Sequence, residues 1–282
     1  MESGDVDTVA YNLQSPSFFI DMRFPTTMPG NIAYRGSLSQ CSDEELRYLS
    51  RQHCFSGYSL LDKAEDKKNG QFTRYHIIDW NYHPSFPRPR PNRWRAECNE
   101  DNTSFKEYSV AKDDYGVPAY FERYARYPND SNGQKYLVAW SSRCNPSSHA
   151  TRECVLIVMG QHFAFVRDRA VPFPSFSGAP GPGGPALIDY ALDNDLREEA
   201  EAYLDLEGSY GKIRSDLSWV IERSTHPWRA NTPLFNSGDI SLIIENGKAK
   251  ALKWQKMEFV LFECSFTNVE LGLLFSHSKS KL

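Results

Sequence analysis

The stretch SFFIDMRF, residues 17–24, alternates between two kinds of side chain. Apolar side chains occupy every second position, and two of the residues between them are charged. The apolar set is Phe18, Ile20, Met22 and Phe24, and Phe19, Asp21 and Arg23 lie between them. Because successive side chains of a β-strand point to opposite faces, this alternation predicts a strand with one face toward a core.

Further strand-length segments rich in β-forming residues follow, separated by clusters of Gly, Asn, Asp or Pro. They read FSGYSLL, RYHIIDW, SFKEYSVA, AYFERYAR, KYLVAWSS, ECVLIVMG and HFAFVRD. Several short strands with one apolar face predict a mainly β fold, either a sandwich or a closed barrel of antiparallel strands. Residues 41–52 break this pattern, because Ser42 and Glu45 have capping-box spacing and predict a short helix.

Residues 172–186, PFPSFSGAPGPGGPA, interrupt all periodicity, because Gly and Pro disfavour both helix and strand. This segment predicts a linker between a first domain at 1–171 and a second, smaller one at 187–282. The second domain opens with an acidic amphipathic pattern that predicts one helix. Shorter strands follow, and Asn246-Gly247 predicts a two-residue hairpin turn between two of them.

Composition excludes several classes of function. The chain has 282 residues, a net charge of −4 and a pI near 6.0, so a basic groove for nucleic acid is not expected. No apolar run approaches the ~18 residues of a membrane-spanning helix, and the N-terminal residues lack the apolar segment of a signal peptide. We therefore expect a cytoplasmic protein, a monomer or a homodimer, without membrane insertion.

Sequence motifs for cofactor chemistry are missing. The six cysteines have no CxxC spacing and the seven histidines form no HExxH pattern, which argues against a zinc site. Neither GxSxG, a phosphate-binding loop nor a dinucleotide fingerprint is present, and the glycines at 178–184 follow no βαβ strand. We therefore expect no cofactor and no metal.

Several segments, taken in their order along the chain, carry a family resemblance. They are FFIDMRF, HCFSGYS, YHIIDW, AYFERYAR and ECVLIVMGQHFAFVRD, with SWVIERSTHPW matching more loosely. This order resembles the fungal HRI family over roughly residues 17–170. The chain departs from the family pattern after YHIIDW, where FPRPRPNRWR replaces a more acidic loop.

The resemblance implies two consecutive calycin-like (lipocalin-related) β-barrels and leaves two classes of function open. Relatives of this double barrel include cofactor-free pericyclases, among them hetero-Diels–Alderases that join a tropolone quinone methide to a humulene-type sesquiterpene in fungal secondary metabolism. The alternative is a non-catalytic protein that binds a small ligand or a kinase partner. An isomerase or dehydratase acting in the same pocket is a third hypothesis. A pericyclase of this kind implies a small hydrophobic organic substrate.

Four polar residues are candidate catalytic groups: His76, Tyr124, Arg23 and Glu122. In AYFERYAR, Glu122 and Tyr124 share a strand face, which is typical either of a ligand cavity or of a solvent-facing row. Arg23 either forms an exposed pair with Asp21 or is a buried handle that donates to an acidic oxygen pair. His76 is either a core histidine or a donor to a substrate carbonyl, and it also suits assistance in loss of water.

Aromatic residues are the candidate walls of a substrate cavity. The set comprises Tyr58, Trp80, Trp140, Tyr120 and Trp94, and plain core packing is the alternative for each. The segment around Trp94 contains FPRPRP, which has polyproline II character and suits a peptide that a partner docks. Strands of one meander lie on both sides of it, so we expect an ordered rim loop with Trp94 as an apolar plug.

Overall fold

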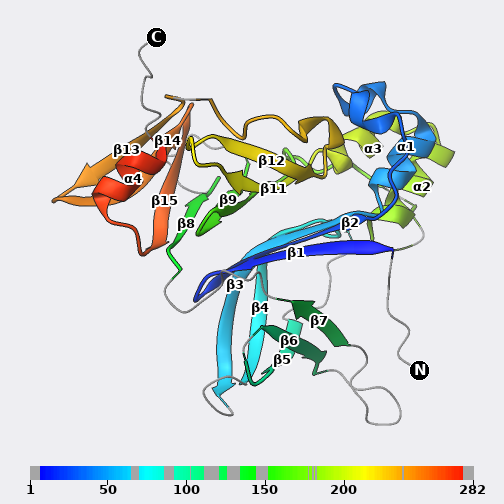
Figure 1. Ribbon diagram of the computed structural model, residues 1–282. Helices are drawn as coiled ribbons and strands as arrows, with labels where there is room; N and C mark the ends of the chain where they lie inside the picture. Colours follow the sequence, from blue (N-terminus) through cyan, green and yellow to red (C-terminus); the bar gives the residue numbers. More distant parts are fainter. Residues whose placement is uncertain are drawn as a thin grey trace.

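Two antiparallel sheets dominate the protein (Figure 1). The computed structural model describes residues 7–64, 70–85, 92–101, 103–110, 121–125, 134–143, 152–176, 178–179, 181, 183–236 and 238–275. Short helices accompany the sheets within this part of the chain. The predicted fold class, mainly β with two calycin-like antiparallel β-barrels and short accessory helices, is confirmed by these two antiparallel sheets, of which the first is strongly curled.

The first sheet is a meander of seven strands in the order of the sequence. Its strands are β1 (Thr8–Gln14), β2 (Phe18–Pro25), β3 (His53–Ala64), β4 (Gly70–Asp79), β5 (Asn92–Cys98), β6 (Ser104–Ser109) and β7 (Phe121–Ala125). The guanidinium of Arg23 on β2 lies 2.6 Å from Glu122 on β7. These two strands are not neighbours in the sheet, so their contact shows that the sheet curls strongly.

The second sheet has eight strands in the order β12-β11-β10-β9-β8-β15-β14-β13. Its strands are β8 (Tyr136–Ser141), β9 (Cys154–Met159), β10 (His162–Arg167), β11 (Glu207–Ile213), β12 (Trp219–Ser224), β13 (Ile240–Glu245), β14 (Lys248–Trp254) and β15 (Met257–Cys264). Asn246 and Gly247 both have positive φ between β13 and β14, as the predicted two-residue hairpin turn requires.

The predicted domain boundary is corrected by this strand order. Strands from both sides of residues 172–186 share the second sheet, because β10 pairs with β11 and β8 pairs with β15. Two barrels confined to 1–171 and 187–282 are therefore not observed. Gly and Pro prevent regular structure within this segment, but they do not prevent the chain from returning to the same sheet, whose two edges at β8 and β10 were open for pairing.

The proposed linker is itself part of the packed structure. Phe176 is buried and meets the ring of Tyr203 edge to face, and α2 (Gly184–Asp193) begins inside the segment. The predicted single helix after residue 187 is two helices, α2 and α3 (Arg197–Leu204), because Asp195 has a φ of 59° that stops the first one.

The remaining helices are short. The predicted helix at 41–52 is confirmed as α1 (Asp43–Leu49), with Ser42 and Glu45 forming the capping box. A C-terminal helix α4 (Asn268–Phe275) packs near β13, and the described residues also form three 3-10 turns. These turns are η1 (Ile32–Tyr34), η2 (Leu38–Gln40) and η3 (Pro227–Arg229). No helix among the described residues is long and apolar enough to cross a membrane.

Two clusters of buried hydrophobic residues pack against the sheets. The first joins Ile20 and Met22 of β2 to Val155 and Val166 of the second sheet, so the apolar face predicted for residues 17–24 lies between the sheets. The second cluster lies on strands of the second sheet and includes Phe165, Trp254 and residues of α4. The polar face of β2 must therefore turn away from the first cluster, into the curl of the first sheet.

Candidate functional site

Three of the four predicted polar residues meet inside the curl of the first sheet. Arg23 makes a bidentate ion pair with Glu122, with distances of 2.6 and 3.0 Å, and its Nε donates to Asp21 at 2.8 Å. The Tyr124 hydroxyl lies 2.6 Å from Glu122 Oε2 and 3.2 Å from Asp21 Oδ2. Arg23 is therefore a partly buried handle rather than an exposed pair, and Glu122 and Tyr124 point inward together.

A second ion pair extends this network toward β4 and β6. Arg74 donates to both oxygens of Glu107 at 2.7 and 3.0 Å, and both side chains are nearly inaccessible, at 5% and 2%. The guanidinium carbon of Arg74 lies 4.9 Å from the ring centre of Phe19, and Trp94 stands 6.0 Å away. These rings exclude water, so the charges depend on one another for stabilisation. Together Asp21, Arg23, Arg74, Glu107, Glu122 and Tyr124 form the inner network.

The inner network shifts the pKa values of its members. Burial raises the pKa of the Tyr124 hydroxyl, and the carboxylates of Asp21 and Glu122 raise it further, so the hydroxyl stays protonated. Burial would raise the pKa of Asp21, but the Arg23 and Arg74 guanidiniums outweigh it and the pKa lies below its ordinary value. Burial raises the pKa of Glu107 to about 7, with Arg74 opposing and the other carboxylates adding to the shift.

Glu107 makes the free energy of unfolding depend on pH. Its ordinary pKa is near 4.5, so between pH 4.5 and about 7 the folded protein holds a proton that the unfolded chain has released. This contribution is complete below pH 4.5 and is lost as pH rises through about 7. Between pH 5 and 8, wild type should lose roughly 2–3 kcal/mol more than Glu107→Gln in urea unfolding.

The matched control for this prediction is Glu222→Gln, whose carboxylate is 42% exposed in a surface pair with Lys212. It should follow wild type at both pH values. Equal pH slopes for wild type and Glu107→Gln would show that Glu107 does not hold this proton in the folded protein.

The other predicted residues do not belong to the inner network. His76 Nδ1 is 3.1 Å from Asp79 Oδ2, and the imidazole packs between the rings of Phe19 and Phe55. Trp80 is fully buried beside Arg169, so it is core. Tyr120 lies outside the described residues.

The remaining predicted wall residues lie in two different parts of the structure. Tyr58 and Trp140 belong to one aromatic row, in which Phe18 and Phe262 connect them with ring-centre distances of 5.2 to 6.4 Å. Trp94 is not a loop plug as expected: it is a buried residue of β5, where it pairs with Phe72, because the strand begins at Asn92. The FPRPRP stretch before it lies outside the described residues.

A pocket of about 550 Å³ lies elsewhere, on the second sheet. Strands β10, β11 and β14 form its floor, and its rim comes from residues 36–38, 226, 228–229, 232–236 and 239. Its lining is Gly36, Ser37, Leu38, Phe165, Arg167, Asp205, Glu207, His226, Trp228, Arg229, Thr232, Pro233, Leu234, Phe235, Asn236, Asp239, Trp254, Gln255 and Met257. We call it the Glu207 pocket.

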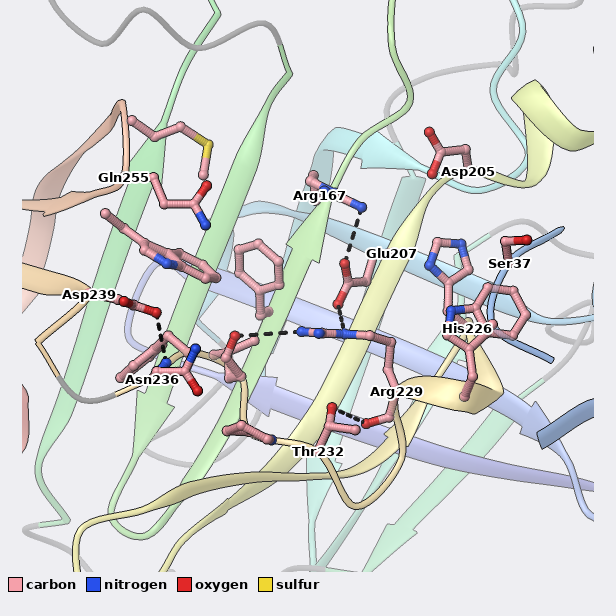
Figure 2. A pocket seen from close by; sticks show the side chains of 18 of the residues that line it. Ser37, Arg167, Asp205, Glu207, His226, Arg229, Thr232, Asn236, Asp239 and Gln255 are labelled. Atoms are coloured by element: carbon pink, nitrogen blue, oxygen red, sulfur yellow. Dashed lines mark hydrogen bonds and ion pairs between the residues drawn. The ribbon is translucent and has the colours of Figure 1, made fainter. Parts of the chain in front are cut away.

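Glu207 lies between two arginines in this pocket (Figure 2). Arg167 faces Glu207 directly across the β10–β11 pair, with Nη2 3.2 Å from Oε2. Arg229 reaches from η3, and its Nε lies 3.1 Å from Glu207 Oε1. The Ser209 hydroxyl donates to the same oxygen at 3.1 Å. The carboxylate is buried, and it is held by partners on three separate segments.

Two N–H groups in the pocket lining have no hydrogen-bond partner among the described residues. They are Nε of Arg167 and Nε1 of Trp254, and both atoms are buried. An unpaired buried donor costs about 1–3 kcal/mol, so such atoms are uncommon unless something else satisfies them. Phe165 is two residues from Arg167 on β10, and its ring centre is 5.4 Å from that of Trp254. The pocket therefore offers polar donors beside an aromatic wall.

His226 contributes a neutral imidazole to the rim. Burial lowers its pKa below the ordinary value, although Glu207 and Asp205 oppose the shift. Its Nε2 donates to the carbonyl of Leu204 at 3.3 Å, and its ring stacks on Trp228 at 5.1 Å. In this tautomer Nδ1 is an acceptor.

Sequence reasoning did not find the Glu207 pocket, because its residues come from distant segments. Arg167 is the last residue of β10 and the second-last of the run HFAFVRD, and Glu207 begins β11 forty positions later. The available signal was a charged residue at each of these strand ends, together with the aromatic and basic residues of STHPWR. None of these features shows that the three segments meet.

Comparisons with known proteins identify the fold alone. No family model matches the chain, and no curated protein matches it either. Among solved structures, an uncharacterized protein from Saccharomyces cerevisiae is similar, with 10% sequence identity and a TM-score of 0.52. The match covers 91% of this chain and 92% of that protein. At this identity the similarity shows the fold alone and says nothing about activity.

Proposed function

We infer that this protein binds a small organic molecule in the Glu207 pocket. The observation that carries the proposal is the pairing of an aromatic wall with two buried N–H groups that lack partners. Ligand sites of proteins are typically concave, about 300–1,000 Å³ in volume, and combine apolar walls with a few fixed polar groups. The pocket falls within this range, at about 550 Å³.

The inner network is a less suitable ligand site than the Glu207 pocket. One buried N–H, Nε of Arg74, lacks a partner there among the described residues. The guanidiniums and carboxylates of the network, however, already pair with one another at 2.6 to 3.0 Å, so a ligand would have to displace these ion pairs. Removing one partner of a buried pair costs about 3–5 kcal/mol, which a small ligand would have to recover. The proposed roles of Arg23, Glu122 and Tyr124 toward a substrate stay predictions.

A second candidate function is a cofactor-independent pericyclase acting in the same pocket. Its expected reaction is the hetero-Diels–Alder cycloaddition of a tropolone quinone methide with a humulene-type sesquiterpene. The pocket favours it through two features: aromatic walls that can hold two reactants in one orientation, and N–H groups that can polarise an electron-poor carbonyl. Orientation alone supplies up to roughly 7–11 kcal/mol in ideal cases, and one donor contributes on the order of 10²–10³ in rate.

The binding proposal predicts that two-ring aromatic compounds with an oxygen substituent bind the protein. We expect measurable heats of binding for at least one of naphthalene-2-carboxylate, naphthalene-2-carboxamide and naphthalen-2-ol. The variant Met257→Trp, which fills the pocket, should abolish them, whereas Met28→Trp, at a site 43% exposed and outside the pocket, should not. No binding of any of the three, or binding unchanged by Met257→Trp, would contradict the proposal.

The same variants separate binding from catalysis. A quinone methide precursor and humulene are incubated with wild type, Met28→Trp or Met257→Trp, and the adduct is measured against a protein-free reaction. The pericyclase is supported if wild type and Met28→Trp form the adduct faster than the protein-free reaction does and Met257→Trp does not. Binding without any acceleration supports the non-catalytic function.

A further inference from the structure

We propose that the ligand of the Glu207 pocket is an aromatic carboxylic acid, held with its carboxylate on Arg167 and Arg229 and a second oxygen near Trp254. This inference rests on the proposed binding function and adds the chemical class of the ligand. It follows from the charges around Glu207, the donors left over there, and the spacing between the two ends of the pocket.

The charges around Glu207 are unequal. Two guanidiniums share one carboxylate, with ion-pair distances of 3.2 Å from Arg167 and 3.1 Å from Arg229. The other acids of the lining do not correct this excess. Asp205 pairs with Arg152 at 2.6 Å, and Asp239 accepts the backbone N–H of Asn236. Figure 2 shows Asp205 and Asp239 on opposite sides of the pocket, and no dashed line joins either of them to Arg167 or Arg229. One added negative charge would balance the trio.

The arginines also retain donors for such a charge. A guanidinium has five N–H groups, and Glu207 uses only part of them. Arg167 keeps its Nε without a partner, and Arg229 uses Nε for Glu207 and Nη2 for a long contact of 3.5 Å to the Leu234 carbonyl. A carboxylate matches the planar fork of a guanidinium and accepts two parallel hydrogen bonds from it, which a neutral amide cannot.

The separation between the two unpaired donors indicates how large the ring system of the ligand should be. Phe165 and Arg167 lie two residues apart on one face of β10, about 7 Å along the strand. The ring centre of Trp254 lies 5.4 Å from that of Phe165. A planar ring system over Phe165 would therefore reach from the arginines to Trp254. The indole N–H of Trp254, whose side chain is nine-tenths buried, would then donate to an oxygen at the far end.

Calorimetric titration with three probes tests both ends of the pocket. Naphthalene-2-carboxylate should bind roughly tenfold or more tightly than naphthalene-2-carboxamide, because hydrogen bonds to charged groups are the stronger ones. The variant Arg229→Gln should remove this preference, whereas Arg223→Gln, at an exposed position on β12, should keep it. 6-Methoxynaphthalene-2-carboxylate should bind severalfold more tightly than the unsubstituted acid, and Trp254→Phe should remove that gain alone.

The outcomes distinguish this inference from the proposed function. Equal dissociation constants for the acid and the amide, both weakened by Met257→Trp, would overturn the carboxylate assignment and leave the binding function standing. A methoxy gain that survives in Trp254→Phe would overturn the role of the indole N–H. Absence of binding by these three probes would overturn the inference, and absence of binding by naphthalen-2-ol as well would overturn the proposed function with it. Circular dichroism and the unfolding midpoint of each variant verify that it folds.

Discussion

Arg74→Met should lower the free energy of unfolding by about 3–5 kcal/mol, one of the two largest losses that we expect from a single substitution. Arg74 is the buried partner of Glu107, and both oxygens of that carboxylate accept from it. Methionine keeps much of the volume against Phe19 and Trp94, so the loss isolates the charge rather than a cavity. It leaves three carboxylates of the inner network with one guanidinium, Arg23.

The matched control is Arg95→Met on the neighbouring strand. Arg95 is 41% exposed in its ion pair with Glu97, and exposed pairs contribute about 0–1 kcal/mol. Urea unfolding of both variants at pH 8, where Glu107 is ionised, gives the comparison. Losses of similar size in the two variants would show that the inner network is solvated and does not stabilise the curl of the first sheet.

Arg169→Met should cost at least about 3 kcal/mol of unfolding free energy, since each hydrogen bond from a charged donor contributes about 1.5–3 kcal/mol. The Arg169 side chain is fully buried, and its guanidinium donates to the backbone carbonyls of Asp79, Trp80 and Tyr203. It also lies 4.1 Å from the ring centre of Tyr203. This one side chain joins the end of β4 to helix α3, so its loss should loosen the first sheet from the helices.

Arg223→Met is the control for Arg169, because Arg223 is an exposed strand residue of β12. Its free energy of unfolding should equal that of wild type within the effect of a surface substitution, about ±0.5 kcal/mol. Hydrogen exchange supplies a second readout. The backbone amides of residues 79–82 and of α3 should exchange faster in Arg169→Met alone. A midpoint equal to that of wild type would contradict the joining role.

Local patterns predicted much of the fold. The alternation at 17–24 predicted the strand and its apolar face between the sheets, although Phe19 and Asp21 on the other face are buried as well. The capping box at Ser42 and Glu45 predicted helix α1. These features depend on neighbouring residues, so a single sequence is enough to show them. The pairing of β8 with β15 depends on segments more than a hundred residues apart, and no local pattern records it. The same reason explains the incorrect boundary at 172–186.

The same difference between local and long-range information applies to the candidate site residues. Period-two spacing placed Glu122 and Tyr124 on one face, and the structure adds Arg23 from a strand that is distant in sequence. Spacing could not show that Asp21, Arg74 and Glu107 complete this group and satisfy its charges. Nor could it show that Arg167, Glu207 and Arg229 meet on the second sheet, since they come from three segments.

A crystal structure of the protein soaked with naphthalene-2-carboxylate tests the central claim most directly. We predict electron density for the ring system over Phe165 in the Glu207 pocket, with the carboxylate within hydrogen-bond distance of Arg167 and Arg229. The inner network should keep its ion pairs unchanged. Density for the ligand inside the curl of the first sheet, with the Arg23–Glu122 pair opened, would contradict the claim and return the site to the first sheet.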